Sequence, residues 1–327
     1  MTIRTILFCC LTMASTSSVF AQGNGQPQAE PVGYRPAEGE IEVQEGGPYI
    51  ETEVPSNYAP PSVVSSGIWQ LLVPRKGAAT FTYLGGGGED GLGITSIDTS
   101  ASFMAPLPIW GGMYGSLTPG FSWNALDGPS GFDLPSDLYR GSLSLGFIKP
   151  FENGSQLVIG ISPTFATDGH SDASDAFQFN AFGMYNWKRS EKFSWQLGIA
   201  ATGRDDIPIL PAVGFTWKPN DNWLIEASVP RPRIAHRLQW FPNLGENWAY
   251  VAGEFGGGTY GVDRNGTSDQ LTLRDFRLLL GWERRNPGGF SPSVEAGYVF
   301  GRELEYESDG SKFKPSDTFL IRASVSF

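Results

Sequence analysis

The sequence has almost no cysteine. Only Cys9 and Cys10 occur in 327 residues, and both lie close to the start of the chain. The segment that holds them has a single charge at Arg4, an apolar stretch over residues 6–14 and then small residues, which is the layout of a secretory signal peptide over residues 1–21. A buried N-terminal helix is the alternative. Without the signal peptide the chain has no cysteine, which excludes disulfides and thiolate metal sites.

Positive charge is also scarce. The sequence carries 23 Lys+Arg against 34 Asp+Glu, and loss of Arg4 with the signal peptide leaves 22 against 34, a net charge of −12. Such a chain has no basic stripe that could displace the counterions of a nucleic acid, and it is too acidic to attach to an anionic membrane surface. We therefore expect no nucleic acid as a partner.

Long apolar runs are absent after the signal peptide. No later run approaches the roughly 18 residues that predict a transmembrane helix. Residues 22–76 contain seven glutamates and no aspartate, many prolines and glycines, and little periodicity. Such a segment cannot bury enough apolar surface to fold alone, so we interpret it as a largely unstructured, acidic, Pro/Gly-rich periplasmic linker. Its last part could dock on the remainder of the chain through Trp69, Leu71 and Leu72; a disordered leader is the simpler alternative.

From Gly77 onward, apolar residues alternate with small or polar ones, which is the period of a β-strand. Fourteen segments have this pattern, at residues 77–84, 92–104, 113–124, 138–149, 155–166, 176–187, 192–203, 208–218, 222–230, 234–241, 247–256, 269–284, 290–301 and 316–327. Many are longer than the roughly 5–6 residues usual in a soluble sandwich. The sequence therefore predicts an all-β fold, an antiparallel transmembrane β-barrel of about 14 strands (12–16), over residues 77–327.

The connections between these segments also favour a membrane barrel. Short turns alternate with longer polar connections, such as 125–137, 256–268 and 302–316, as expected for periplasmic turns and external loops. Aromatic pairs flank four of the short turns: Trp187 and Phe193, Trp217 and Trp223, Trp240 and Trp248, Trp282 and Phe290. Rows of aromatics are typical of a membrane interface. We expect the bacterial outer membrane as the location and its lipid as a partner.

The sequence ends in the alternating segment TFLIRASVSF. One face of it carries five apolar residues: Phe319, Ile321, Ala323, Val325 and Phe327. In a closed barrel this strand would pair with the first, so that no backbone group is left unpaired in lipid. The ending resembles the C-terminal targeting signal of bacterial outer-membrane β-barrel proteins, a terminal aromatic preceded by apolar residues at alternate positions. The resemblance implies that the barrel-assembly machinery reads these five residues.

Two further segments carry a narrower resemblance. VPRPRIAHRL (229–238) and LRDFRLLLGWERR (273–285) are similar to recurring segments of a family of uncharacterised exported proteins common in planctomycetes. The resemblance covers most of residues 77–327. It implies a barrel and carries over no activity.

Glycine spacing gives no firm nucleotide site. The spacing G-x-G-x-x-G occurs at 86–91 and 256–261, but neither stretch opens the helix whose N-terminus would hold a pyrophosphate. We interpret both as glycine-rich loops at the rim. Residues 263–269 resemble a calcium loop, but the glycine stands at the fourth position and not the sixth, so we predict a turn.

His170 and His236 are the only histidines available for acid–base catalysis. His170 lies in DGHSDASD, which would allow an external metal site or an outer-membrane hydrolase with an Asp–His pair; a solvated acidic loop is the favoured interpretation. His236 shares its face with apolar neighbours, so we expect it to point outward. We therefore expect no catalytic residue, no metal and no cofactor.

Nine charged residues fall on the polar faces of the expected strands: Asp98, Arg140, Glu226, Arg237, Asp275, Arg277, Glu283, Glu295 and Arg322. A charge that faces lipid costs about 2–4 kcal/mol at mid-depth, so we predict that all nine face the lumen. There they either line an aqueous pathway or pair with one another in a filled interior. The strand at 269–284 changes phase near Arg274 and Asp275, which predicts a β-bulge.

These features favour a channel or transporter for small solutes. The alternatives are a structural barrel with a closed lumen and, third, the hydrolase. Residues 77–327 carry 19 Lys+Arg against 27 Asp+Glu, so an open lumen is expected to favour cations.

Overall fold

A computed structural model describes residues 76–87, 90–107, 112–129, 131–203, 208–241, 245–286 and 289–327. The expected signal peptide, the expected linker up to residue 75 and its docking residues Trp69, Leu71 and Leu72 lie outside these ranges. Within them, no helix is long and apolar enough to cross a membrane.

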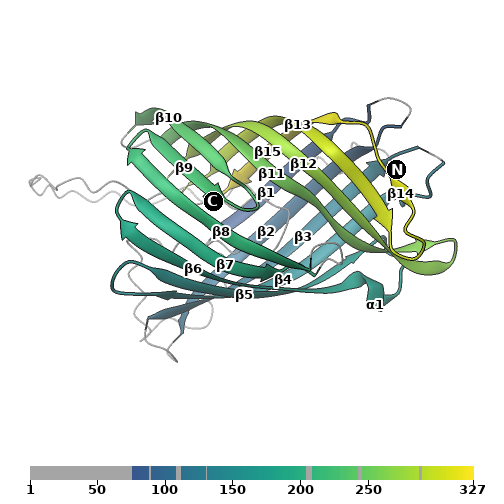
Figure 1. Cartoon of the computed structure of the whole chain (residues 1–327), viewed down its shortest axis with the longest axis horizontal. Helices are drawn as coiled ribbons and strands as arrows, with labels where there is room; N and C mark the ends of the chain where they lie inside the picture. Colours follow the sequence, from purple (N-terminus) through teal and green to yellow (C-terminus); the bar gives the residue numbers. More distant parts are fainter. Residues whose placement is uncertain are drawn as a thin grey trace, which may run out of the picture. The chain divides into compact units, whose positions relative to one another are not determined.

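The described chain is almost entirely β-strand (Figure 1). Its helix, α1, is the four-residue segment Ala173–Ala176. The strands are β1 (Lys76–Leu84), β2 (Gly93–Leu107), β3 (Met113–Asp127), β4 (Asp137–Pro150), β5 (Gln156–Thr167), β6 (Phe177–Ser190), β7 (Phe193–Ala201), β8 (Ile209–Asn220), β9 (Trp223–Ser228), β10 (Arg233–Phe241), β11 (Gly245–Arg264), β12 (Thr267–Arg285), β13 (Ser291–Tyr306), β14 (Lys312–Phe313) and β15 (Thr318–Ser326).

The strands form a closed antiparallel barrel. From β2 to β13 each strand pairs with the one before it, and β15 pairs with both β13 and β1. The two-residue β14 is attached to the edge of β13, so fourteen strands make the wall. Ala78 pairs with Ser326 and Leu84 with Leu320, which confirms the predicted union of first and last strands. The predicted fold class and strand number are both confirmed.

The two ends of the barrel differ. At one end, called the short-turn end, neighbouring strands are joined by tight connections such as 191–192 and 221–222. At the other, called the long-loop end, lie α1, β14 and longer connections such as 128–136 and 307–317 (Figure 1). This asymmetry follows the predicted alternation of turns and loops.

The outer face of the barrel is apolar. Each of the fourteen wall strands contributes at least one large apolar side chain that is exposed, for example Leu197 on β7 at 65% and Leu280 on β12 at 64%. The outward positions of β15 include Phe319 and Ile321, and Phe327 directly follows the strand; each of the three is about half exposed. A soluble sheet would bury this face, whereas here the alternation turns it outward.

One predicted loop is wrong. Residues 256–268 are mostly strand, because β11 and β12 continue as a paired hairpin to a two-residue turn at Asn265 and Gly266. Both turn residues have positive φ, 55° and 83°, as a tight hairpin turn of this kind requires. The glycine stretch 256–261 is therefore part of β11 and not a rim loop. We call residues 256–273 the lid hairpin.

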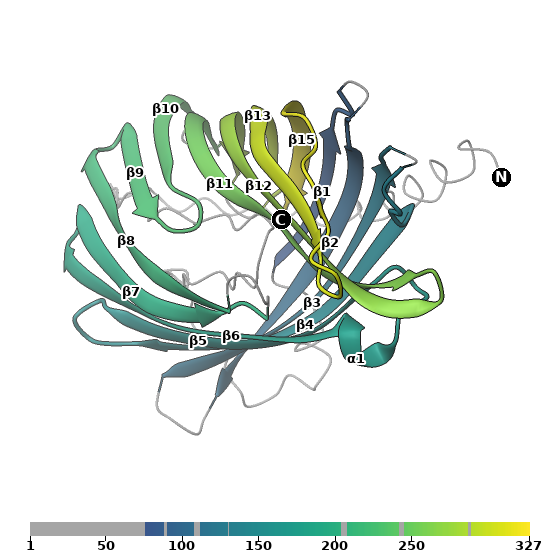
Figure 2. The same ribbon diagram turned by 45° about the vertical axis from the view of Figure 1, so that its right-hand side comes forward.

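The lid hairpin crosses the long-loop end. Gly257, with φ +105°, stands where β11 leaves the wall, in a backbone region that favours glycine. Beyond it the hairpin reaches α1 and the end of β5, which belong to the far side of the ring (Figure 2). There Gly261 lies beside Thr167 in a parallel bridge, and the Asp168 N–H donates to the Gly261 carbonyl at 3.1 Å.

The predicted bulge is present, with a different origin. The β12–β13 register shifts between Arg274 and Phe276, but the extra residue belongs to β13, near Gly301 with φ +61°. Strand β12 keeps its phase. Its apolar residues change sides because Leu271, within the lid hairpin, is buried inward, whereas Leu278, Leu280 and Trp282 toward the short-turn end are exposed outward.

One aromatic of the expected interface rows is also misplaced. Trp248 is only 6% exposed and faces the lumen, while Trp240, its expected partner, is exposed. A register shift between Arg237 and Gln239 breaks the simple alternation along β10. Trp248 belongs to the interior.

Candidate functional site

The inner surface of the barrel has two unlike halves. Strands β2 to β8 present mainly small hydroxyl, amide and glycine residues to the lumen. Neighbouring strands are linked there by hydroxyl pairs, such as Ser144 with Ser162 at 2.9 Å and Ser102 with Thr118 at 2.7 Å. Strands β9 to β13 and β15 carry large apolar and charged residues instead, such as Leu224, Tyr250 and Arg322.

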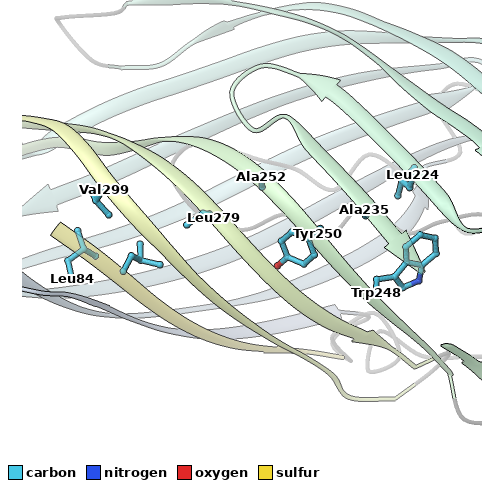
Figure 3. Close-up of a cluster of buried hydrophobic side chains, with 9 residues drawn as sticks. Leu84, Leu224, Ala235, Trp248, Tyr250, Ala252, Leu279 and Val299 are labelled. Carbon is cyan, nitrogen blue, oxygen red and sulfur yellow. The ribbon is translucent and has the colours of Figure 1, made fainter. Parts of the chain in front are cut away.

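An apolar cluster follows the second half of the wall (Figure 3). It comprises Leu84, Leu224, Ala235, Trp248, Tyr250, Ala252, Leu279, Val299 and Leu320. Tyr250 leans over a glycine, because a Cβ at Gly281 would lie 2.2 Å from its ring. The phenol of Tyr250 donates to Glu295 Oε1 at 2.7 Å, which joins the cluster to the charged groups beside it.

Arg322 is the centre of an ion-pair network. It donates to Glu254 from Nη1 and Nη2, both at 2.9 Å, and from Nη1 to Glu295 Oε2 at 2.8 Å. Its Nε donates to the Thr82 hydroxyl at 3.2 Å. Arg277 reaches Glu254 Oε1 at 2.7 Å from the next strand. All three nitrogens of Arg322 are therefore used, and the network ties β15 to β1, β11 and β13.

A second group of charges continues the network toward the short-turn end. Arg233 donates two hydrogen bonds to Glu283, at 2.9 and 2.6 Å. Its guanidinium lies 4.3 Å from the ring centroid of Tyr250. Arg285 also donates to Glu283, at 2.6 Å. Such charge-assisted, two-pronged contacts are the strong form of ion pair.

The lumen holds a cavity of about 480 Å³. The hydroxyl-rich half of the wall forms most of its lining, and six arginines face it: Arg140, Arg231, Arg233, Arg277, Arg285 and Arg322. Three carboxylates also line it, namely Asp98, Glu226 and Asp275. A cavity of this size is within the range of about 300–1,000 Å³ that holds a small molecule.

The structure places the nine predicted lumen residues on the inner side of the wall. Six of them line the cavity: Asp98, Arg140, Glu226, Asp275, Arg277 and Arg322. Glu283 and Glu295 are 1% exposed and bind the arginines from behind. Arg237 lies nearer the short-turn end, where it pairs with Glu246 at 3.1 Å. Both sequence interpretations therefore have a structural counterpart, since some charges line space and others pair.

Sequence reasoning missed four charged members of this site. Arg285 lies one residue beyond the predicted strand at 269–284. Glu254 has the same period as Tyr250 and Ala252 on its strand, so the alternation could have found it. Arg233 is the first residue of β10, whereas the predicted strand began one residue later, at 234. Arg231 precedes that strand and pairs with Glu295 and Glu254, so no strand pattern marked it.

The acidic loop around His170 holds the lid hairpin. Asp168 is only 8% exposed, and its carboxylate accepts the backbone N–H groups of His170 and Ser171 at 2.8 and 3.0 Å. It also accepts the Asp263 N–H, from the hairpin, at 2.8 Å. Asp175 accepts the Ser268 hydroxyl at 2.5 Å. The loop is exposed at His170 and Asp172, as a solvated acidic loop would be, but two of its carboxylates are also the acceptors that dock the hairpin.

A second apolar cluster fills the space beneath the lid hairpin. It comprises Leu92, Leu138, Ala166, Tyr260, Val262, Leu271, Leu273, Leu304 and Tyr306. Three side chains of the hydroxyl-rich half reach the hairpin as well. Asn124 donates to the Tyr260 hydroxyl at 3.3 Å, and Gln178 donates to the Thr259 carbonyl at 2.7 Å. The guanidinium of Arg140 lies 4.6 Å from the Tyr260 ring centroid.

Charged residues at the rim fix the tip of the hairpin. Arg264 pairs with Asp309 at 2.8 Å and lies over the Tyr306 ring. Hydrogen bonds from Ser311, with a further one from Arg264, hold the pKa of Asp309 down to about 2. Asp309 is therefore a charged partner of Arg264 at any ordinary pH.

The two histidines lie at opposite ends of the barrel. His170 is exposed after β5 at the long-loop end, while His236 pairs with Trp223 next to a short turn and contacts that ring on the outer face. They cannot act together. In the described part of the chain, no group of three or more His, Cys, Asp or Glu side chains is placed to hold a metal ion.

The comparison with known families gives a match. The family described as a domain of unknown function, DUF6268, matches residues 130–318, which is more than half of the chain. The chain belongs to the DUF6268 family. The matched region of this DUF6268 protein begins before β4 and extends into β15, so it includes the lid hairpin and most of the ion-pair network.

Several solved structures match, and one of them is a distant likeness. The crystal structure of the COG4313 outer membrane channel from Pseudomonas putida F1 matches with 10% identity and a TM-score of 0.41, over 77% of this chain and 94% of that chain. No curated protein matches. The resemblance to planctomycete proteins remains a prediction.

Proposed function

We propose that this DUF6268 protein is an outer-membrane barrel whose lumen admits small polar solutes. The observation that carries the proposal is the inversion of the wall, apolar and exposed outside on all fourteen strands and polar around a cavity inside. An apolar exterior of this kind is stable in lipid, where the closed ring leaves no backbone group unpaired. Barrels wider than about eight strands also enclose more space than side chains fill.

The charges of the lumen modify the expected selectivity. The net charge of residues 77–327 suggested a preference for cations. In the interior, however, the six arginines at the cavity are matched by six carboxylates: Asp98, Glu226, Glu254, Asp275, Glu283 and Glu295. Because the lumen is close to neutral, we now expect little discrimination between simple cations and anions.

Planar-bilayer recording of the purified full chain tests the proposal. Step-like conductance above that of the bare bilayer, with a reversal potential near zero in a gradient of potassium chloride, is the expected result. If no preparation conducts, and preparations with the lid hairpin shortened do not conduct either, the transport proposal fails.

A structural barrel with a closed lumen is the second candidate. The lid hairpin and the apolar cluster beneath it favour this alternative, because they occupy the long-loop end. The same recordings separate the two functions, since a structural barrel would insert and remain silent. A hydrolase with an Asp–His pair at His170 has less support, because the Asp168 carboxylate accepts backbone N–H groups of its own loop and of the hairpin.

The outward residues of β15 suit the proposed assembly signal. Phe319, Ile321, Ala323 and Val325 alternate on the outer side, and the Phe327 ring covers the backbone of Gly77, where a Cβ would lie 2.4 Å from the ring. Deletion of Phe327 should reduce heat-modifiable, membrane-inserted protein more than deletion of one residue from the linker. Equal amounts of inserted protein would contradict recognition by the barrel-assembly machinery.

A further inference from the structure

Two opposite charges in the lumen have no counter-charge in the described part of the chain. Asp98 on β2 is 6% exposed, lines the cavity, and makes no hydrogen bond or ion pair there. Arg140 on β4 lines the same cavity without a carboxylate partner among the residues that the structure describes, and its Nε is buried with no acceptor. The other five arginines at the cavity all pair with Glu or Asp.

Asp98 and Arg140 lie in one row across the sheet. Asp98 pairs with Ser122 on β3, and Ser122 pairs with Arg140 on β4. Two strand spacings separate their Cα atoms by about 10 Å, and all three residues line the cavity. The row therefore presents a carboxylate, a hydroxyl and a guanidinium in sequence, and the two charges do not neutralise each other.

The surroundings hold the guanidinium of Arg140 in place. It lies against the Tyr260 ring of the lid hairpin, and a Cβ at Gly258 would come within 2.2 Å of its Nη2. Glycine at that position leaves room for the charged group. The phenol of Tyr260 is itself fixed by Asn124. An arginine whose guanidinium was simply solvated by water would not need the space that Gly258 leaves between the wall and the lid hairpin.

Unpaired charges at low exposure are costly. A buried ionised group is destabilising by several kcal/mol unless a counter-charge or hydrogen-bond partner reaches it. A simple anion would be attracted by Arg140 and repelled by Asp98. A simple cation would be attracted by Asp98 and repelled by Arg140. A solute with both charges satisfies the two residues at once.

We propose that the row of Asp98, Ser122 and Arg140 is a binding site for a zwitterionic solute, with its ammonium group at Asp98 and its carboxylate at Arg140. The site deepens the proposed function, on which it rests only in that the lumen must be accessible to small solutes. The serine hydroxyl between the charges can bind either end of such a solute.

Isothermal titration of the purified full chain in detergent tests the site with three matched probes. These are δ-aminovalerate, which carries both charges, valerate, which has only the carboxylate, and pentylammonium, which has only the ammonium. We expect δ-aminovalerate to bind about tenfold more tightly than either of the others, because it makes both charge-assisted contacts.

Two variants separate the contacts. Asp98→Asn should remove the advantage of δ-aminovalerate over valerate, and Arg140→Gln its advantage over pentylammonium. The matched controls are Asp317→Asn and Arg189→Gln, which remove the same charges from exposed positions at the rims and should keep the wild-type order. Equal binding of the three probes, or an order unchanged in both lumen variants, overturns the proposal.

The bilayer recordings distinguish this failure from failure of transport. If the protein conducts but the probes bind alike, the solute site is wrong and the channel stands. If the protein is silent but the probe order and its changes in Asp98→Asn and Arg140→Gln are as expected, the site stands and the channel fails.

Discussion

Arg322 is the residue on which the interior most depends. Its three nitrogens serve Glu254, Glu295 and Thr82, and it is only 3% exposed. If the guanidinium were removed, water would have little access to the buried carboxylates of Glu254 and Glu295. The position is therefore a case in which breaking a buried pair costs far more than the pair itself contributes.

We predict that Arg322→Gln lowers the free energy of unfolding by about 3–5 kcal/mol, because two buried carboxylates lose a shared partner. The measurement is the urea midpoint of the folded, heat-modifiable form in detergent. Arg189→Gln, at an exposed position, should change the free energy of unfolding by about 0.5 kcal/mol or less. Similar midpoints for both variants would contradict the central role of Arg322.

The small residues beside the cluster make a separate test. Gly281 has no room for a side chain because the Tyr250 ring covers it. Gly281→Val should displace Tyr250 from Glu295 and destabilise the barrel by about 1–3 kcal/mol, as overpacking does. Gly131→Val, where a Cβ would meet nothing within 4 Å, is the control. A loss of stability no larger than that of the control would argue against the packing described.

At the scale of elements, the lid hairpin determines what the lumen can admit. Its tip depends on Asp168, which accepts N–H groups from both the hairpin and its own loop. Asp172, in the same loop, makes no side-chain cap to α1 and offers a matched comparison. Comparing a variant of Asp168 with the same variant of Asp172 therefore distinguishes the effect of undocking the hairpin from the effect of losing a negative charge.

We predict that Asp168→Ala increases the open fraction in bilayer recordings, because the backbone N–H of Asp263 loses its acceptor. Asp172→Ala should leave the open fraction unchanged. Replacing residues 259–272 by an Asn-Gly turn between Gly258 and Leu273, which are register partners, should give the upper limit of conductance. If this shortened chain conducts no more than the full one, the hairpin does not limit passage.

The lid hairpin also marks where sequence reasoning ended. Strand alternation correctly predicted the wall, its fourteen strands and the meeting of β1 with β15, because those strands have one face toward an apolar medium and one toward a polar interior. Beyond the wall the same alternation is inverted, with Leu271 and Val262 buried inward. Period 2 assigns residues to two faces but does not say what covers each face.

The candidate site was predictable to a similar degree. The cost of a charge in lipid was enough to assign the nine residues to one side of the wall. The sequence does not reveal which charges pair, because pairing depends on distances across the ring. In the described chain Arg140 lacks a carboxylate partner, while Arg322 has two. Strand alternation did not identify Arg231, because this residue lies between two strands.

For the whole molecule, the distribution of lysines and arginines allows a test of orientation. Lys312 and Lys314 are exposed at the long-loop end, whereas Arg189 and Lys192 are exposed at the short-turn end. We predict that trypsin added to intact cells cuts after Lys312, because the bond after Lys314 precedes Pro315 and resists trypsin. Arg189 and Lys192 should be spared until the outer membrane is permeabilised.

The structure also refines the expected pattern of protease access. Residues 125–137 and 302–316 should be cut from outside by proteases of suitable specificity, but 256–268 should resist, because the hairpin is paired and docked. Segments 218–222 and 285–289 should resist on intact cells. Cleavage at Arg189 or Lys192 before permeabilisation would reverse the orientation.

The union of β1 with β15 also governs how quickly the barrel can form. Thr80 and Ser324, which are linked by a hydrogen bond across it, are 244 residues apart in sequence. Bringing such distant segments together costs about 5 kcal/mol in chain entropy before any contact compensates for it. Until then both strands are open edges that could recruit another chain. We therefore expect closure to be the slow step of assembly, and a closed barrel to reopen very slowly.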